Sequence, residues 1–335
     1  MSSPDGQAGP SSPDPAAERV IPERLRQLVR FLETYERPVG VSWVEFLASF
    51  DALMNDVPVP IPVPEIVTVR RMADWNLRIA LWRVSDAPDL PVVIHLHGGA
   101  WTSGNHLTHR GLAAELAARG YLVVSVDYRR APKHPFPAAY EDCVAVLDWC
   151  TANLAAHGGD PARIALIGDS AGANLAAAVM VTDASPRVRA GALLFGIYDY
   201  HRNLERLGSL SNASGYVRHS ELDQLRGDPR LSPEAAAGRL PFCCIAVGGR
   251  DRLVGEAEAL HQALEADDRP HVYQVIPGAP HSYIQLPGHP DYAEGIESLA
   301  GFLGYALRDE PAPAAWTSGG SVCFLAPEPI TVSRS

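Results

Sequence analysis

The sequence predicts an α/β fold with a mostly parallel central sheet, and three observations support this. Strand-like and helical patterns alternate from residue 64 onward. The central strand patterns are apolar almost throughout, as in strands that are buried on both faces. The chain has 335 residues, 47% of them hydrophobic, which is enough to bury a large core. Repeated alternation of this kind indicates a sheet with helices on both faces.

Each element is predicted from the spacing of its apolar residues. The strand patterns lie at residues 65–72, 77–84, 91–97, 121–128, 163–168, 190–196, 242–249 and 271–278. The helical patterns lie at residues 107–119, 137–156, 171–182, 255–267 and 290–307. An irregular polar insertion at 199–240, with at most two short helices, interrupts the alternation. In the tail, SVCFLAPEPITV is compatible with an edge strand or with a loose end.

The predicted organisation has four parts. Residues 1–18 are rich in Ser, Pro, Gly and Asp and are expected to be disordered, because they bury too little apolar surface to offset the entropy of ordering. Residues 19–60 contain two helical patterns and then the run VPVPIPVPE, an extended connector. The α/β domain follows at 61–308, with its insertion at 199–240, and residues 309–335 form a tail.

Composition excludes several classes of protein. A net charge of −11 without a basic stripe argues against a nucleic-acid partner. Five cysteines, an odd number without a C-x-x-C pair, argue against both a disulfide framework and a zinc ribbon. No apolar run reaches the ~18 residues that a membrane span requires. The N-terminus has no basic region followed by an apolar one, so a cytoplasmic protein is expected.

Ser170 is the first candidate catalytic residue. It lies in GDSAG, between the apolar run RIALIG and the alanine-rich run AGANLAAAVM. A strand, a tight turn and a helix would expose its hydroxyl at the carboxyl end of the sheet, where open α/β sheets bind ligands. Gly168 and Gly172 leave room for such a turn. The alternative is a serine that caps an ordinary helix.

A serine nucleophile needs a base, and the base needs an orienting partner. Asp251 follows the strand pattern FCCIAVGG, and His281 follows the next one, HVYQVIPG. Both are therefore expected at the same sheet edge as Ser170. Taken alone, Asp251 is more often a turn residue or helix cap, and His281 a surface-loop histidine. Three residue types in the required order, each directly after an apolar strand pattern, favour a Ser-His-Asp arrangement.

The segment HGGAW at 97–101 provides candidate donors for an oxyanion, each worth about 3–4 kcal/mol. The N–H groups of Gly98 and Gly99, with that of Ala171 after the serine, are the predicted donors. The alternative is a glycine-rich turn that only joins strand to helix. A zinc site on His95 and His97 is a further alternative, but no spaced carboxylate cluster supports it, so no metal or organic cofactor is expected.

Four blocks of sequence resemble the hormone-sensitive-lipase family of α/β-hydrolases, in its microbial esterase branch. They are HGGAW at 97–101, DYRRAPKHPFPAAYEDC at 127–143, GDSAGAN at 168–174, and GGRDRLVGEAEAL with PHSY at 248–260 and 280–283. The resemblance covers about residues 60–307. It implies an α/β-hydrolase fold in which Ser170, Asp251 and His281 are the triad, and Gly98, Gly99 and Ala171 the oxyanion hole. It also implies a cap over the site, built from the N-terminal helices and the insertion.

The sequence departs from the family pattern at several positions. Ala100 replaces a common third glycine, Lys133 stands where Glu is usual, and Ser282 stands where Gly usually follows the histidine. The insertion lacks the aromatic-rich helix usual in the family's cap. Asp199, Tyr200 and His201 either reach the pocket or are surface-loop residues, and the second interpretation is favoured. These departures concern the substrate pocket more than the chemistry.

The resemblance implies a serine hydrolase that cleaves carboxylic esters of small acyl groups through an acyl-enzyme on Ser170, with a small-molecule ester as its partner. A general esterase and a deacetylase of a small metabolite fit equally well. One alternative is a transferase or cyclase, in which an amine or hydroxyl takes the acyl group. Another is an amide hydrolase such as an arylformamidase. A non-enzymatic ligand receptor is a minor alternative, since such a protein is expected to lose a triad residue. Pairing of two copies through the strand at 271–278 is a further hypothesis.

Overall fold

The computed structural model describes residues 26, 27, 30, 51–183, 187–207, 215–317 and 322–325. The predicted disorder of residues 1–18 lies outside the described residues. The same holds for most of the two helical patterns before residue 51. Residues 51–54 are helical, and the connector that follows has no regular structure up to residue 64, as predicted.

The described strands form one mixed sheet. They are β1 (Glu65–Arg71), β2 (Asn76–Trp82), β3 (Leu90–Leu96), β4 (Leu122–Asp127), β5 (Gly159–Asp169), β6 (Ala190–Leu194), β7 (Phe242–Gly248), β8 (His271–Ile276) and β9 (Val322–Leu325). Their order is β1-β2-β4-β3-β5-β6-β7-β8-β9. All pairs from β4 through β8 are parallel, while β1, β2 and β9 pair antiparallel to their neighbours. The predicted mostly parallel sheet is confirmed.

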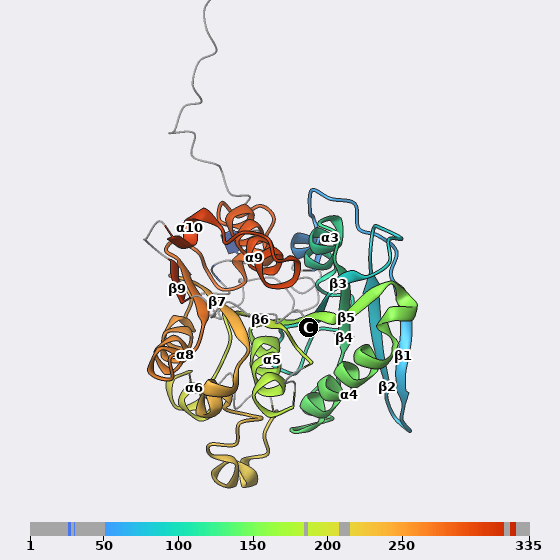
Figure 1. The fold of residues 1–335 in the computed structure, drawn as a ribbon. Helices are drawn as coiled ribbons and strands as arrows, with labels where there is room; N and C mark the ends of the chain where they lie inside the picture. Colours follow the sequence, from blue (N-terminus) through green and yellow to red (C-terminus); the bar gives the residue numbers. More distant parts are fainter. Residues whose placement is uncertain are drawn as a thin grey trace, which may run out of the picture.

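Helices cover both faces of the sheet (Figure 1). On one face lie α3 (Arg110–Ala118) and α9 (Tyr292–Arg308); on the other lie α4 (Ala138–Asn153), α5 (Ala171–Thr182) and α8 (Val254–Ala266). Helix α5 is buried from Ala171 to Val181 because its many alanines let it lie close to the sheet. The remaining helices are short: η1 (Leu154–His157), α6 (Tyr200–Leu207), η2 (His219–Glu221), η3 (Asp223–Leu225), η4 (Pro233–Arg239), η5 (Tyr283–Gln285) and α10 (Ala314–Thr317).

The described residues of the tail add a helix and the outermost strand at one edge of the sheet. Strand β9 pairs antiparallel with β8, in a register that sets Leu325 opposite His271. In α10, Trp316 is 6% exposed and packs on Phe302 and Tyr305 of α9. Of the two states that the sequence left open, the described residues 322–325 adopt the edge strand. The hypothesis that β8 is an open edge for a second copy is therefore wrong, because β7 and β9 flank it.

The insertion has more regular structure than its sequence predicted. It contains α6 followed by η2, η3 and η4. Tyr200 and His201 are 1% and 4% exposed, so their interpretation as surface-loop residues is wrong. The insertion is fastened to the α/β domain by Glu256 of α8. That buried carboxylate accepts hydrogen bonds from the N–H groups of Tyr198 and Asp199 and from the guanidinium of Arg202.

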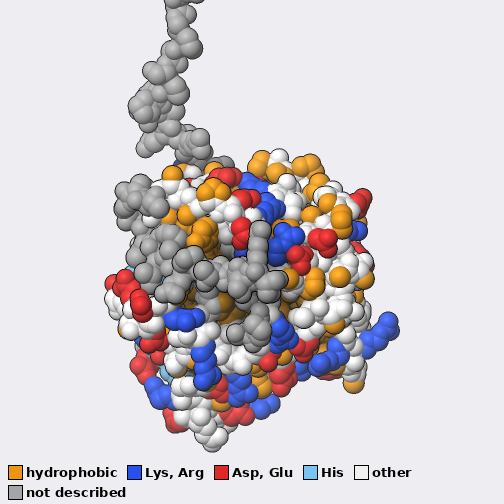
Figure 2. Space-filling view, viewed as in Figure 1, with side chains coloured by type: hydrophobic (Ala, Val, Ile, Leu, Met, Phe, Trp, Pro, Cys, Tyr) orange, Lys and Arg blue, Asp and Glu red, His pale blue; other side chains and the backbone are white. Residues whose placement is uncertain are grey.

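The surface is mixed in charge. On the face drawn in Figure 2, side chains of both signs are interspersed with apolar ones. None of the helices in the described part of the chain combines the length and the hydropathy needed to cross a bilayer.

Candidate active site

Ser170 lies at a strained turn between β5 and α5. Its φ is +53° and its ψ −118°, a conformation that non-glycine residues rarely adopt. The turn is tight enough to require glycine on both sides. A Cβ on Gly168 would come within 2.2 Å of the Gly172 carbonyl oxygen, and one on Gly172 within 1.9 Å of the Leu96 carbonyl oxygen. The two glycines of GDSAG therefore allow the backbone to pass directly from β5 into α5.

The three predicted catalytic side chains meet at the carboxyl edge of the sheet. Ser170 follows β5, Asp251 follows β7 and His281 follows β8. These strands are parallel and lie near one another in the sheet, with only β6 between β5 and β7, so the loops that follow them are on the same side. His281 Nε2 lies 3.2 Å from Ser170 Oγ, and His281 Nδ1 lies 2.7 Å from Asp251 Oδ2. The other oxygen of Asp251 accepts the N–H of Leu253 at 2.8 Å. One hydrogen-bonded chain therefore joins carboxylate, imidazole and hydroxyl.

His281 is buried, at 6% exposure, and its surroundings favour the protonated ring. Burial by itself lowers the pKa of His281, but the Asp251 carboxylate, with a smaller contribution from Asp169, outweighs it and raises that pKa above 6.5. Phe195 packs edge-on against the imidazole at 4.9 Å between ring centroids. The ring is thus held between a carboxylate and an aromatic wall, with Nε2 toward Ser170.

The loop after β3 lies beside Ser170 because β3 pairs with β5, with Leu96 opposite Gly168. The Gly98 N–H does not face the hydroxyl: it donates to Asp169 Oδ2 at 3.0 Å. This corrects the prediction that Gly98 is an oxyanion donor. The N–H groups of Gly99 and Ala100 make no hydrogen bond to the rest of the described chain. Ala171 is the first residue of α5, where an N–H has no partner within the helix.

The block at 127–143 supports this loop. The Tyr128 hydroxyl donates to the His97 carbonyl oxygen at 2.6 Å, and its ring stacks on the His97 imidazole at 4.2 Å. The Ala131 N–H donates to the Trp101 carbonyl oxygen at 2.9 Å. The block at 127–143, which contains none of the predicted catalytic residues, is therefore bonded to the loop that carries the N–H groups of Gly99 and Ala100.

The two histidines considered as zinc ligands are engaged separately. His95 Nε2 lies 3.0 Å from Asp169 Oδ1, while His97 Nδ1 lies 2.8 Å from the Gly98 carbonyl oxygen. Burial lowers the pKa of His95 and brings that of His97 to about 3, so both rings are neutral at pH 7. Across the described residues, no group of three or more His, Cys, Asp or Glu side chains has an arrangement that could hold a metal ion.

Two departures from the family pattern fall on backbone positions that usually favour glycine. Ala100 has a φ of +50° and Ser282, next to His281, a φ of +64°. Each non-glycine residue in this region costs about 1–2 kcal/mol. The site keeps its geometry in spite of these replacements. Lys133 lies at the surface, 3.4 Å from Asp74 and away from these turns.

An aromatic cluster that the sequence did not predict joins the insertion to the loop. Trp101 stacks on Tyr216, with ring centroids 4.5 Å apart and planes 3° apart, and contacts Tyr200 edge-on at 5.6 Å. Phe136 packs against the same Tyr216 ring. No local pattern could have revealed these contacts, because Trp101 and Tyr216 are far apart in sequence and the insertion has no clear periodicity.

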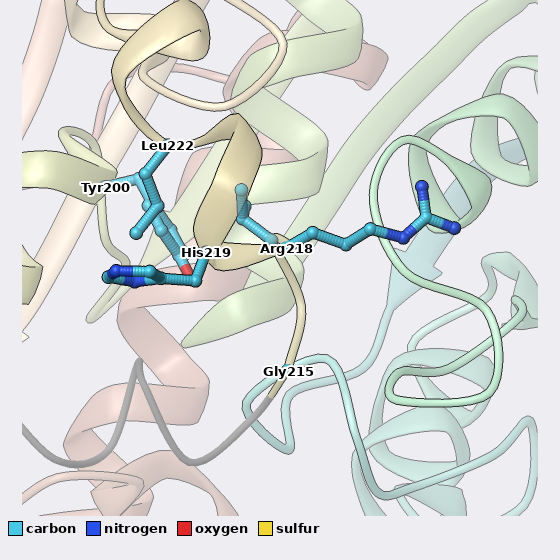
Figure 3. A pocket seen from close by; sticks show the side chains of 6 residues that line it. Tyr200, Gly215, Arg218, His219 and Leu222 are labelled. Atoms are coloured by element: carbon cyan, nitrogen blue, oxygen red, sulfur yellow. The ribbon is translucent and has the colours of Figure 1, made fainter.

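A cavity of about 570 Å³ opens within the insertion (Figure 3). Tyr200, His219 and Leu222 lie together in it, whereas the Arg218 side chain extends away from them. The cavity lining is completed by Gly215 and Val217. Tyr200 therefore both lines this cavity and contacts Trp101 of the loop that follows β3.

The strand order, with Ser170 at a tight strand-to-helix turn, defines the class of an α/β-hydrolase fold. A family model described as alpha/beta hydrolase fold matches residues 93–285. The chain is 50% identical over 107 residues to carboxylesterase NlhH of Mycobacterium tuberculosis, covering 32% of this chain and 33% of the relative. It is 31% identical over 261 residues to an acetyl-hydrolase of Streptomyces hygroscopicus, covering 72% of this chain and 83% of the relative.

Among solved structures, a hyperthermophilic esterase from the archaeon Pyrobaculum calidifontis superposes with a TM-score of 0.70 at 27% identity, covering 84% of this chain and 97% of that one. The chain therefore belongs to the hormone-sensitive-lipase family of α/β-hydrolases. It spans a third of the length of NlhH and 60% of that of LipN, a carboxylic ester hydrolase of the same Mycobacterium.

Proposed function

We propose that the protein is a serine hydrolase that cleaves carboxylic esters of small acyl groups through an acyl-enzyme on Ser170. The observation that carries this proposal is the hydrogen-bonded chain from Asp251 through His281 to Ser170. It lies beside a loop in which the N–H groups of Gly99 and Ala100 make no hydrogen bond within the described residues and could bind an oxyanion. Three relatives named as ester or acetyl hydrolases support the same reaction.

In the first half of the reaction, His281 Nε2 accepts the Ser170 hydroxyl proton while Oγ bonds to the ester carbonyl carbon. The carbonyl oxygen becomes an oxyanion, which the N–H groups of Gly99 and Ala171 bind. The bond to the alcohol oxygen then breaks, and that oxygen takes the proton from His281. Asp251 holds the ring tautomer and stabilises the imidazolium, so the proton moves without a cofactor.

In the second half, His281 deprotonates a water that attacks the acyl carbon. Collapse of this second oxyanion returns the proton to Ser170 and releases the acid. A transferase or cyclase would replace this water by an amine or hydroxyl, and an amide hydrolase would release an amine in the first half. Neither alternative is favoured by an observation in the structure or by the names of the relatives.

The acyl group is proposed to be short, since the Streptomyces relative is named an acetyl-hydrolase. The direct test measures release of acid and alcohol from p-nitrophenyl acetate and p-nitrophenyl laurate by the purified protein. We expect the acetate to be hydrolysed faster, and the Ser170→Ala variant to lose at least about 10⁴-fold in kcat. Ser85→Ala, an exposed serine in the loop before β3, is the matched control. Hydrolysis by Ser170→Ala at the native rate would contradict the proposal.

Three further expectations accompany this function. Residues 61–308 are proposed to form the catalytic domain, with 199–240 and the N-terminal helices as its cap. A cytoplasmic location is proposed and is supported by the four buried free thiols, Cys143, Cys150, Cys243 and Cys244. Homodimer formation remains a hypothesis that sedimentation would test. With β8 covered by β9, the outermost strands of the described sheet are β1 and β9, and pairing of two copies through a sheet edge would use one of these.

A further inference from the structure

Phe195, the first residue after β6, has a backbone conformation that bulky residues rarely adopt. Its φ is +41°, in the region that usually favours glycine, and the residue is 0% exposed. Strand β6 lies between β5 and β7, which precede Ser170 and Asp251 in the chain. Phe195 therefore leaves the sheet between the strand of the candidate nucleophile and the strand of the candidate acid.

Hydrogen bonds to both neighbouring strands fix the backbone at this point. The Phe195 N–H donates to the Ala246 carbonyl oxygen of β7 at 2.7 Å. On the other side of β6, the Ser170 N–H donates to the Leu194 carbonyl oxygen at 2.9 Å. The unusual φ is thus imposed by the sheet itself, at the place where β6 ends.

The residues that follow are held just as closely. A Cβ on Gly196 would lie 2.6 Å from the Tyr198 ring, so the chain passes that ring only as glycine. The Gly196 N–H also donates to the Tyr198 hydroxyl at 3.2 Å. The Ile197 carbonyl oxygen accepts a hydrogen bond from Asn174 Nδ2 at 3.0 Å. A strained conformation persists only where its surroundings over-determine it, and such strain is often part of a mechanism.

The Phe195 ring packs on the segment that carries the candidate histidine. Its centroid lies 4.9 Å from that of the His281 imidazole, with 69° between the ring planes. It lies 5.9 Å from the ring of Tyr283, two residues further on. Tyr283 also packs on α9, where a Cβ on Gly295 would lie 2.6 Å from its ring. The segment 281–283 is thus packed against Phe195 and, through Tyr283, against α9.

The imidazole needs a second contact to keep Nε2 directed at Ser170. The hydrogen bond to Asp251 fixes only the Nδ1 end of the ring. The χ2 torsion of histidine is broad, so a ring held at one end can still turn. Such a turn would move Nε2 away from Ser170 Oγ, which Nε2 must approach to accept the proton. The Phe195 ring, packed against the imidazole, opposes that rotation.

We propose that Phe195 is a positioning residue for His281, and that the strained backbone after β6 places its ring against the imidazole. The proposal rests on the ester hydrolase function above. Phe195 takes no proton and acts on the reaction only through His281. Its loss should therefore lower kcat and leave KM nearly unchanged, because alignment of the base matters in proton transfer and not in substrate binding.

The first test measures kcat and KM on p-nitrophenyl acetate. Phe195→Ala is expected to lower kcat at least about tenfold, with KM changed less than threefold. Phe195→Leu keeps an apolar side chain against the imidazole and is expected to recover most of the lost kcat. Phe195→Gly lacks the ring but relieves the backbone strain, so it should have the kcat of Phe195→Ala and a higher melting temperature than that variant.

A second test asks whether the effect passes through His281. The rate at which a fluorophosphonate modifies Ser170 is measured with and without Phe195→Ala, in the wild type and in His281→Ala. In the wild type, Phe195→Ala should slow the modification at least about tenfold. In His281→Ala there is no base left to position, so Phe195→Ala should change the rate less than about twofold.

The matched control is Phe302→Ala in α9. Phe302 is also 0% exposed, and it packs on Phe242. Phe302→Ala is expected to lower the melting temperature by several degrees, while kcat stays within about twofold of the wild type. The control separates the loss of a buried ring anywhere in the core from the loss of the ring beside His281.

The outcomes separate the inference from the proposed function. If the wild type is active and Ser170→Ala is not, native kcat in Phe195→Ala, or equal losses of kcat in Phe195→Ala and Phe302→Ala, overturns the inference alone. A raised KM at native kcat does the same, since it marks a substrate contact. So does an equal slowing of the fluorophosphonate reaction in His281→Ala.

A wild type without esterase activity, or a fully active Ser170→Ala, overturns the proposed function and the inference together. If Phe195→Ala does not fold, Phe195→Gly replaces it in each comparison, because it lacks the same ring without the strain. Native kcat in Phe195→Gly would then overturn the inference.

Discussion

The carboxyl edge of the sheet and the insertion above it are built in different ways. At the sheet edge, Ser170, Asp251 and His281 follow parallel strands, and the backbone that carries them is fixed by strand pairing. In the insertion, short helices are fixed by side chains: the ion network around Glu256 and the stack of Tyr216 on Trp101. Substitutions at the sheet edge should therefore lower kcat strongly and change the free energy of unfolding little. Substitutions in the insertion should lower the free energy of unfolding and change kcat little.

The largest expected effect is on the triad carboxylate. Asp251→Asn keeps the shape of the side chain but removes the charge that orients and stabilises protonated His281, so kcat should fall about 10⁴-fold. The melting temperature should change by only a few degrees. Steady-state kinetics beside thermal unfolding check both parts. A large drop in melting temperature with modest loss of kcat would break the contrast between the two regions.

The Tyr216 stack is where the two regions meet, so its loss should affect both properties. Tyr216→Ala removes a buried ring from Trp101 and should lower the free energy of unfolding by about 3 kcal/mol. It should also lower kcat about tenfold, because Trp101 belongs to the loop that carries Gly99. Tyr216→Phe keeps the ring and serves as the control. Native kcat in a folded Tyr216→Ala would show that the insertion does not support the loop.

Within the insertion, the Arg202 network should affect stability alone. Arg202 bridges Glu234 and the buried Glu256, and Arg202→Met should cost about 1.5–3 kcal/mol of unfolding free energy with kcat within threefold of wild type. Arg226→Met breaks the exposed pair with Glu205 and should cost less than about 1 kcal/mol. Chemical denaturation of the two variants makes the comparison. Equal losses would mean that burial of Glu256 contributes nothing.

The smallest effect concerns pH. The pKa of His281 is raised above 6.5, so activity, which needs the neutral ring, should fall as pH drops through that raised value. The same shift stabilises the fold below pH 6.5, and this stabilisation is lost as pH rises through the raised pKa. The pH dependence of this stabilisation is measured by comparing the unfolding free energies of wild type and His281→Gln from pH 5 to 9. A difference between the two that grows with pH would contradict the sign.

The sequence predicted the sheet and the positions of the three catalytic candidates because both depend on local patterns. An apolar strand pattern ends at a definite residue, and parallel strands bring such residues to one edge. Whether the Gly98 N–H is free could not be predicted, since it depends on the side-chain direction of Asp169, more than 70 positions later. The contacts of Tyr216 could not be predicted for a similar reason. The insertion is polar and has no regular spacing of apolar residues that would indicate which residues Tyr216 packs against.

The central claim is that Ser170 is a nucleophile activated by His281, and covalent trapping tests it most directly. The wild type, treated with a fluorophosphonate, is analysed by intact mass and by peptide mapping. We expect the addition of one phosphonyl group, on Ser170, and a much slower addition in His281→Ala. A wild type that remains unmodified, or that carries the label on another residue, would contradict the account.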